Sequence, residues 1–156
     1  MTDARVEALL ERYRQAGWKL RTAESCTAGG IAARIGSVPG ASTVLDRSWV
    51  TYSNEAKTEE LGVDPAVIAA HGAVSREVVQ KMAAGGSAPD TVCLAVSGIA
   101  GPDGGTHDKP VGTVWMAITM PGGPLRVERF LFSGNRTEIQ RATVEQALDW
   151  LLAYQR

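Results

Sequence analysis

The chain has 156 residues and a formal net charge of −1, and 44% of its residues are hydrophobic. This length and apolar content suit one domain with a buried core, so we expect residues 1–156 to form a single domain. The charged residues are dispersed, which leaves no stretch that would attract nucleic acid or an anionic membrane by bulk charge. We therefore expect no nucleic acid and no membrane as partners, and any anionic ligand must be bound by a local site.

The first residues and the cysteines indicate the compartment. No apolar run approaches the length needed to cross a membrane, and residues 1–15 are charged with a helical pattern, unlike a signal peptide. We expect a cytoplasmic protein in which Cys26 and Cys93 are free thiols. The two histidines, His71 and His107, do not cluster with other potential ligands, so the sequence predicts no metal site and no cofactor.

Helices are predicted from apolar residues at three- and four-residue spacing and from residues that cap helix ends. In chain order they are a helix with apolar residues from 6 to 13 that ends at Gly17, one through 31–35, a short one that carries 57 and 61, a short stretch from 65, one over 76–84, and a last one that carries the apolar residues of 139–152. Thr27, Asn54 and Ser75 are expected as N-caps, and Asn135 with Glu138 is expected to form a capping box before the last helix.

Strands are predicted where apolar and β-branched residues lack helical spacing. They cover 18–23, 46–53, 91–98, 113–119 and 125–132. The third is apolar nearly throughout, as expected of a strand buried on both faces, and the PGGP between the last two suits a hairpin. Because helices and strands alternate first and a hairpin comes late, we expect an α/β fold: a three-layer α/β/α sandwich with a mixed, mostly parallel sheet.

Three segments at predicted strand ends carry residues capable of chemistry, since ligands of open α/β sheets collect beyond the carboxyl ends of the strands. They are TAESCTAGG (22–30), VTYSNEAK (50–57) and AVSGIAGPDGG (95–105). Each also has a purely structural interpretation, because serine and threonine before a helix often cap it and glycine-rich loops are often turns. The glycine-rich loop lacks the lysine and hydroxyl residue that end a phosphate-binding P-loop.

A nucleophile in the first segment needs an activating group, because a serine hydroxyl reacts only when a base accepts its proton. His71 and His107 lack an obvious orienting group, which leaves Lys57 as the base if burial lowers its pKa. A lone lysine on a helix is otherwise a solvated surface charge. Cys26 is a rival nucleophile at a helix start, although cysteine is also a common small core residue.

Six motifs follow one another along residues 20–114: TAESCTAGG, SVPGAS, VTYSNEAKTEELGV, HGAVS, AVSGIAGPDGGT and KPVGTVW. In this order they resemble the C-terminal domain family of the competence/damage-inducible protein CinA, and the similarity continues more weakly through FSGNR to the last helix. The resemblance implies an α/β fold in its stand-alone form. It also implies a nicotinamide-mononucleotide deamidase, which hydrolyses the nicotinamide carboxamide to nicotinate mononucleotide and ammonia in pyridine-nucleotide salvage.

Carried onto this chain, the resemblance implies a catalytic pair of Ser25 and Lys57, with Tyr52 hydrogen-bonding within the pair to orient the lysine or pass the proton. We expect the substrate to be bound by four residues: Thr27, Ser97, Gly98 and Arg136. The last of these is expected to bind the phosphate in bidentate fashion. Ala28 and Gly30 shift the glycine turn by one residue relative to the family's more common TAESCTGG.

The expected reaction is acyl transfer. Neutral Lys57 accepts the proton of Ser25, the serine oxygen attacks the carboxamide carbon, ammonia leaves, and water hydrolyses the acyl-enzyme. Main-chain N–H groups at the start of the helix after Ser25 are expected to stabilise the oxyanion.

Three other functions are compatible with parts of the sequence. The first is a non-catalytic adaptor or regulatory domain, and the second is an amidase for a different small amide. The third is a nucleotide-binding phosphotransferase, for which the chain has neither a P-loop nor a clear carboxylate pair. Because the family is often oligomeric, the resemblance also implies a homo-oligomer, with Trp49 or Trp150 either at an interface or in the core.

Overall fold

A mixed sheet lies at the centre of the computed structural model, which describes residues 3–153. Within this range the strands follow the order β2-β1-β3-β4-β5. Their bounds are β1 (Lys19–Glu24), β2 (Leu45–Val50), β3 (Thr91–Gly98), β4 (Thr113–Thr119) and β5 (Arg126–Leu131). β1 pairs in parallel with β2 and β3, and β4 pairs antiparallel with β3 and β5. Only β4 therefore runs against the other strands, which confirms a mixed, mostly parallel sheet.

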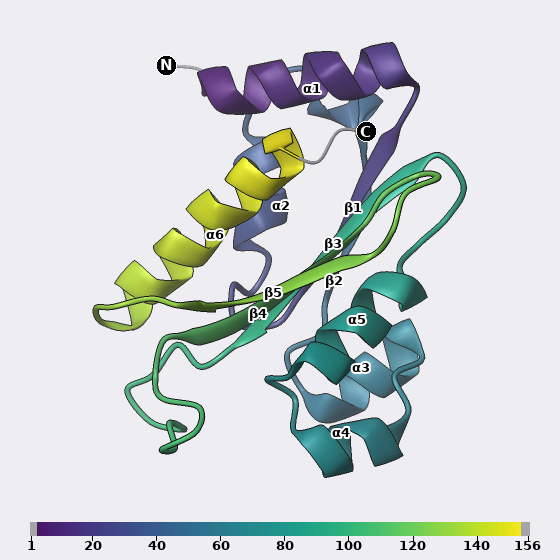
Figure 1. The fold of residues 1–156 in the computed structure, drawn as a ribbon. Coiled ribbons are helices and arrows are strands. Elements are labelled where there is room, and N and C mark those ends of the chain that lie inside the picture. Colours follow the sequence, from purple (N-terminus) through teal and green to yellow (C-terminus); the bar gives the residue numbers. More distant parts are fainter. Residues whose placement is uncertain (1–2, 154–156) are drawn as a thin grey trace.

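Helices cover both faces of the sheet (Figure 1). One face carries α1 (Ala4–Ala16), α2 (Gly30–Gly36) and α6 (Arg136–Ala153). The other carries α3 (Asn54–Leu61), α4 (Pro65–His71) and α5 (Arg76–Gly85). The expected three-layer α/β/α sandwich is confirmed. No helix within residues 3–153 is both long and apolar enough to span a bilayer.

Each face of the sheet has its own apolar core, because successive strand residues point to opposite faces. Val96 of β3 belongs to the core shared with α1, α2 and α6, whereas Cys93 belongs to the core shared with α5. Trp150 is buried in the first core, and Trp49 packs against the second. Both tryptophans therefore pack in or against a core, which is one of the two placements expected for them.

Two expected helix starts are wrong. Ser53 rather than Asn54 is the N-cap of α3, and its hydroxyl accepts a hydrogen bond from the Ala56 amide at 3.0 Å. Thr27 does not cap α2, because the chain turns through left-handed conformations at Ala28 (φ 50°) and Gly29 (φ 90°) before the helix begins. The expected strand over 46–53 also ends earlier, at Val50, where the chain turns toward α3.

The other two expected caps are confirmed. The Ser75 hydroxyl accepts from the Val78 amide at 3.2 Å. Asn135 and Glu138 cap each other's amides, each at 3.0 Å, as a capping box does. β5 runs parallel to β1 and β3, so all three finish at the same end of the sheet, the end where the parallel strands have their carboxyl termini. Because α6 follows β5, it begins at that end and places Arg136 there.

Candidate active site

Ser25 follows directly on β1 and is anchored on both sides of that strand. Its amide donates to the Val96 carbonyl of β3 at 3.1 Å, and the Glu24 carbonyl accepts from the Thr51 amide, after β2, at 2.9 Å. Alternation along the strand places the Ser25 side chain on the same face as Ala23, which packs with the α3–α5 side.

Lys57 of α3 reaches Ser25 from this face. Its Nζ lies 3.0 Å from Ser25 Oγ. The same Nζ lies 2.8, 3.2 and 3.4 Å from the main-chain oxygens of Thr51, Tyr52 and Ser53, respectively. Helical side chains lean toward the N-terminus of their helix, so Lys57 folds back onto the loop that precedes α3. The structure thus brings together the serine and the lysine that the sequence singled out, with exposed fractions of 7% and 1%.

Burial gives Lys57 the protonation behaviour of a base. Loss of solvent disfavours the ammonium form and lowers the pKa of Lys57 from 10.5 to about 8. A neutral amine has two N–H groups and one lone pair. The nearest carbonyls, those of Thr51 and Tyr52, can accept the two N–H groups, which leaves the lone pair for the Ser25 hydroxyl.

The thiol of Cys26 lies in a different environment. It is buried in the core formed with α1, α2 and α6, on the other face of the sheet. Burial raises the pKa of Cys26 to about 12. Because the thiolate is the nucleophilic form, this setting does not favour Cys26 as the nucleophile.

The turn that follows Ser25 is organised by the carboxylate of Glu24, which is fully buried. We call residues 24–32 the Glu24 turn. The carboxylate accepts hydrogen bonds at 2.6–2.9 Å from two hydroxyls and two amides: Thr22 Oγ1, Thr27 Oγ1, Ile31 N and Ala32 N. Sequence reasoning missed this residue, although an acidic side chain that ends a buried strand directly before a glycine turn is an unusual placement.

The Glu24 turn uses groups that were expected to face the substrate. The Thr27 hydroxyl donates its proton to Glu24 Oε1 at 2.6 Å, and substrate binding by Thr27 stays a prediction that its main-chain amide could fulfil. The amides of Ile31 and Ala32, at the start of α2, are bonded to the carboxylate and are not free for an oxyanion. The amides of Cys26 and Thr27 take no part in these bonds.

Tyr52 meets the pair through its main chain. Its carbonyl oxygen lies 3.2 Å from Lys57 Nζ and 3.5 Å from Ser25 Oγ. Its ring is half exposed, and its hydroxyl accepts a hydrogen bond from the Arg136 guanidinium, which also donates to the Gly101 carbonyl at 2.7 Å. Tyr52 thus hydrogen-bonds within the pair as expected, but through its carbonyl, which orients the lysine, while its hydroxyl is bonded to Arg136.

The end of β3 lies beside Ser25. Val96, whose carbonyl accepts the hydrogen bond from the Ser25 amide, is followed by Ser97. Only 1% of Ser97 is exposed. A side chain at Gly98 would place its Cβ 2.6 Å from Val114 Cγ2 and 2.9 Å from the Thr113 carbonyl. Gly98 is therefore required for close strand packing, and this accounts for it without a substrate contact.

The histidines lie away from the pair. His71 ends α4, where its Nδ1 is 3.5 Å from Glu77 Oε1, and His107 is exposed in the loop between β3 and β4. Over residues 3–153, no three His, Cys, Asp or Glu side chains gather closely enough to hold a metal ion.

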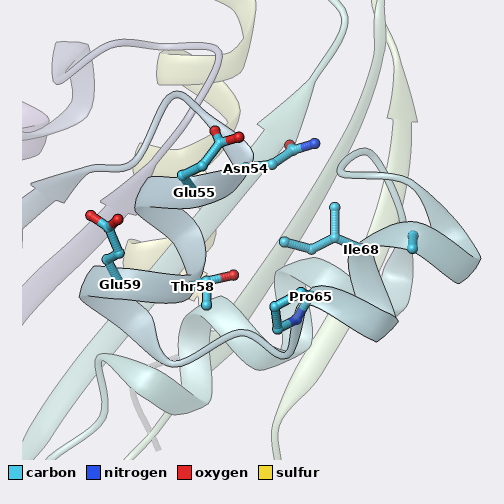
Figure 2. A pocket seen from close by; sticks show the side chains of 7 residues that line it. Asn54, Glu55, Thr58, Glu59, Pro65 and Ile68 are labelled. Atoms are coloured by element: carbon cyan, nitrogen blue, oxygen red, sulfur yellow. The ribbon is translucent and has the colours of Figure 1, made fainter.

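A pocket of about 400 Å³ lies between α3 and α4 (Figure 2). It is lined by Asn54, Glu55, Thr58, Glu59, Pro65, Ile68 and Ala69. Neither Ser25 nor Lys57 is among these residues, because Lys57 points from another side of α3 toward the sheet. This pocket is separate from the serine–lysine pair.

Comparison with known proteins gives matches over nearly the whole chain. The family model "CinA C-terminal domain" matches residues 2–155. Nicotinamide-nucleotide amidohydrolase PncC of Escherichia coli (strain K12) is 44% identical over 157 residues, which cover 97% of this chain and 95% of that protein. A CinA-like protein of Geobacter sp. (strain M21) is 51% identical over 154 residues, which cover 97% of this chain but 36% of that protein.

A solved structure agrees with these sequence matches. The competence/damage inducible protein CihA from Agrobacterium tumefaciens superimposes with a TM-score of 0.90 at 38% identity, covering 100% of this chain and 99% of that chain. The chain thus spans little more than a third of the Geobacter protein but nearly all of PncC and CihA. By sequence and by fold, the chain belongs to the CinA C-terminal domain family.

Proposed function

We propose that this protein is a nicotinamide-nucleotide amidase, which hydrolyses nicotinamide mononucleotide to nicotinate mononucleotide and ammonia in pyridine-nucleotide salvage. The observation that carries the proposal is the buried contact of 3.0 Å between Lys57 Nζ and Ser25 Oγ. The relatives named nicotinamide-nucleotide amidohydrolase, at 44% and 48% identity, support the choice of substrate. The whole chain, residues 1–156, acts as one amidohydrolase domain in this proposal.

The pair performs the reaction in two halves. Neutral Lys57 takes the hydroxyl proton as Ser25 Oγ bonds to the carboxamide carbon, and it then gives that proton to the departing nitrogen, which leaves as ammonia. In the second half Lys57 takes a proton from water, whose oxygen attacks the acyl carbon, and returns the proton to Ser25 Oγ. The carbonyls of Thr51 and Tyr52 keep the amine oriented in both halves.

The oxyanion needs donors other than the start of α2. The amides of Cys26 and Thr27 follow Ser25 in the chain and are not bonded to the Glu24 carboxylate. An amide next to the nucleophile is a common oxyanion donor in serine hydrolases, because it lies close to the carbon that is attacked. We assign the oxyanion to these two amides.

Arg136 is the proposed phosphate ligand, with Ser97 as an additional donor. The guanidinium is exposed at the end of the sheet where Ser25 lies. It donates to two uncharged oxygens, the Tyr52 hydroxyl and the Gly101 carbonyl. A phosphate is a stronger acceptor than either oxygen and can take both N–H groups at once. Tyr52 connects this guanidinium to the pair, since its carbonyl contacts Lys57 and Ser25.

The direct test is to incubate the purified protein with nicotinamide mononucleotide and to measure ammonia and nicotinate mononucleotide. Equal amounts of the two products are expected from the wild type, and none above background from Ser25→Ala. A folded wild-type protein that releases no ammonia would contradict the proposal and favour a non-catalytic adaptor. Faster release from another small amide would keep the chemistry and change the substrate.

Assembly and location complete the proposal. Val50 and Leu131 end the two edge strands, β2 and β5, and they are 52% and 62% exposed. Large apolar side chains exposed on edge strands support a homo-oligomer, for which sedimentation equilibrium should give a multiple of the chain mass. The free, buried thiols of Cys26 and Cys93 support action in the cytoplasm, where thiols stay reduced.

A further inference from the structure

The Glu24 carboxylate is a buried charge that is held entirely by neutral donors. Two of the four donors are hydroxyls and two are main-chain amides. A buried carboxylate is costly unless each oxygen is satisfied, and here each oxygen accepts two hydrogen bonds. The partial positive charge at the start of α2 favours the carboxylate further. Burying such a group costs free energy of folding, which indicates that the carboxylate has a structural role in fixing the chain around it.

What it holds is the chain between β1 and α2. The residue at the N-cap of α2 is Gly29, which has no side chain to bond the first amides of the helix. Glu24 supplies both bonds from the far end of the turn, and the Thr27 hydroxyl ties the middle of the turn to the same carboxylate. Ala28 has a φ of 50°, which is strained for a residue with a side chain and persists only where its surroundings fix it.

Ser25 lies inside this closed turn. Its amide is fixed by Val96 on the strand side, and the Glu24 turn fixes the chain on the helix side. The turn also sets the direction of the Cys26 and Thr27 amides. A displacement of about 1 Å in an active site can cost on the order of 100-fold in rate. The contact of 3.0 Å between Ser25 and Lys57 therefore depends on the geometry of the turn.

We propose that Glu24 is a positioning residue, whose carboxylate fixes the Glu24 turn so that Ser25 and the following amides have their reactive geometry. This inference rests on the proposed function for the role of Ser25. Glu24 itself touches neither the substrate nor the Ser25 hydroxyl. Its loss is therefore expected to lower kcat and to leave substrate affinity nearly unchanged.

The first test is Glu24→Gln, which keeps the shape but replaces an accepting oxygen with an NH₂ group that faces N–H or O–H donors. We expect kcat to fall at least tenfold, KM to stay within about twofold, and the apparent pKa in the pH profile to be unchanged. The matched control is Ser75→Ala, which removes the buried cap of α5. It should lower the melting temperature and keep kcat within about twofold.

A second pair of variants covers the case in which Glu24→Gln does not fold. Thr27→Val keeps the shape and removes the hydroxyl that donates to the carboxylate at 2.6 Å, whereas Thr27→Ser keeps the hydroxyl. We expect kcat to fall in the valine variant and to recover in the serine variant. Equal losses in both would overturn the proposal, because a packing effect would then explain them.

The reactivity of Ser25 toward phenylmethanesulfonyl fluoride gives a readout that needs no substrate. The serine oxygen forms a bond to sulfur, fluoride leaves, and the proton passes to Lys57, so mass spectrometry can follow the rate. The rate should fall in Glu24→Gln and Thr27→Val in proportion to kcat. Folded variants that keep the wild-type rates of sulfonylation and turnover would overturn the positioning role.

The same readout separates the two proposals. Wild-type protein that is sulfonylated at Ser25 but releases no ammonia would overturn the proposed function alone, and the positioning role would then be judged from the sulfonylation rates. Wild-type protein that shows neither reaction would overturn both, since Ser25 would have no reactivity to position.

Discussion

The Glu24 turn and the loop between β3 and β4 lie at the same end of the sheet, beyond the carboxyl ends of β1 and β3, but they are held in different ways. The Glu24 turn is closed by a buried carboxylate and carries Ser25, of which 7% is exposed. In the loop, residues 102–108 are all exposed. Its bonds to other parts of the protein lie near its ends: Lys109 Nζ donates to the His71 carbonyl at 2.6 Å, and Arg136 to the Gly101 carbonyl. In the proposed function, the reacting groups are thus fixed by buried bonds, whereas the exposed Arg136 guanidinium makes bonds that a ligand can replace.

The largest loss of turnover should come from removing the proposed nucleophile, which lies in the buried Glu24 turn. Ser25→Ala is expected to lower kcat by about 10³-fold or more, as loss of a serine nucleophile does in other hydrolases. Cys26→Ala should keep most of the turnover, because the Cys26 thiol faces the core on the other side of the sheet. Ammonia release measures both. The reverse pattern would move the nucleophile to Cys26.

Lys57→Arg should cause the second-largest loss of turnover. Arginine keeps the positive charge but stays protonated, so it cannot accept the Ser25 proton, and general-base loss typically costs about 10²–10⁴-fold in kcat. Its larger head must also fit a site where only 1% of Lys57 is exposed, so circular dichroism should accompany the kinetics. Substantial activity in a folded Arg variant would show that another group is the base.

Arg136→Ala tests the exposed side of the comparison. Hydrogen bonds to a charged group contribute about 1.5–3 kcal/mol, so kcat/KM for nicotinamide mononucleotide should fall about 10- to 100-fold. Nicotinamide riboside lacks the phosphate, so it should be a poor substrate for the wild type and should be affected little by the substitution. This double comparison isolates the pairwise coupling between guanidinium and phosphate. Equal losses for both substrates would remove Arg136 from phosphate binding.

The pH dependence should report the buried lysine. With the pKa of Lys57 lowered to about 8, kcat/KM should rise about tenfold per pH unit below that value and level off above it. The linkage to stability has the same sign. Between about pH 8 and 10.5 the unfolded chain binds the Lys57 proton and the folded chain does not, so the Lys57 contribution to the free energy of unfolding should rise with pH in this window. The buried thiols of Cys26 and Cys93, whose pKa values are raised to about 12, contribute with the opposite sign above about pH 9. The Lys57 contribution is therefore the difference between urea titrations of the wild type and of Lys57→Met, and this difference should grow with pH.

The smallest effect concerns strain in the Glu24 turn. Ala28 has a φ of 50° and an exposed side chain, so Ala28→Gly relieves backbone strain without opening a cavity. The gain is offset in part by the greater freedom of glycine when unfolded, which leaves a net stabilisation of up to about 1 kcal/mol. Thermal unfolding measures it, and kcat should stay within about twofold. Destabilisation would mean that Ala28 is not strained.

Much of the fold follows from local sequence patterns. The strand over 91–98 was predictable because its run of apolar residues has no helical spacing, and its observed bounds are the predicted ones. The cap of α3 was placed one residue late, since Ser53 and Asn54 are both good caps and local sequence does not rank them. Such errors shift an element without changing the topology.

The site was predictable in its side chains and not in its main-chain contacts. Ser25 and Lys57 stand in recognisable segments, and the structure places them together. That Tyr52 contributes a carbonyl depends on how the loop before α3 is oriented. The cap that Glu24 provides to α2 from outside the helix is equally hidden, because capping rules describe residues adjacent to a helix start.

The place of β1 between β2 and β3 has a consequence for when the serine–lysine pair is completed as the chain folds. Ser25 and Lys57 are only 32 positions apart, so both are present in a nascent chain that has not yet reached β3. In such a chain β1 would be an edge strand, and the Ser25 amide would lack its Val96 partner. In the proposed amidase, the geometry of the pair is therefore complete only after β1 has paired with β3, and the onset of hydrolysis during refolding is expected to coincide with that pairing.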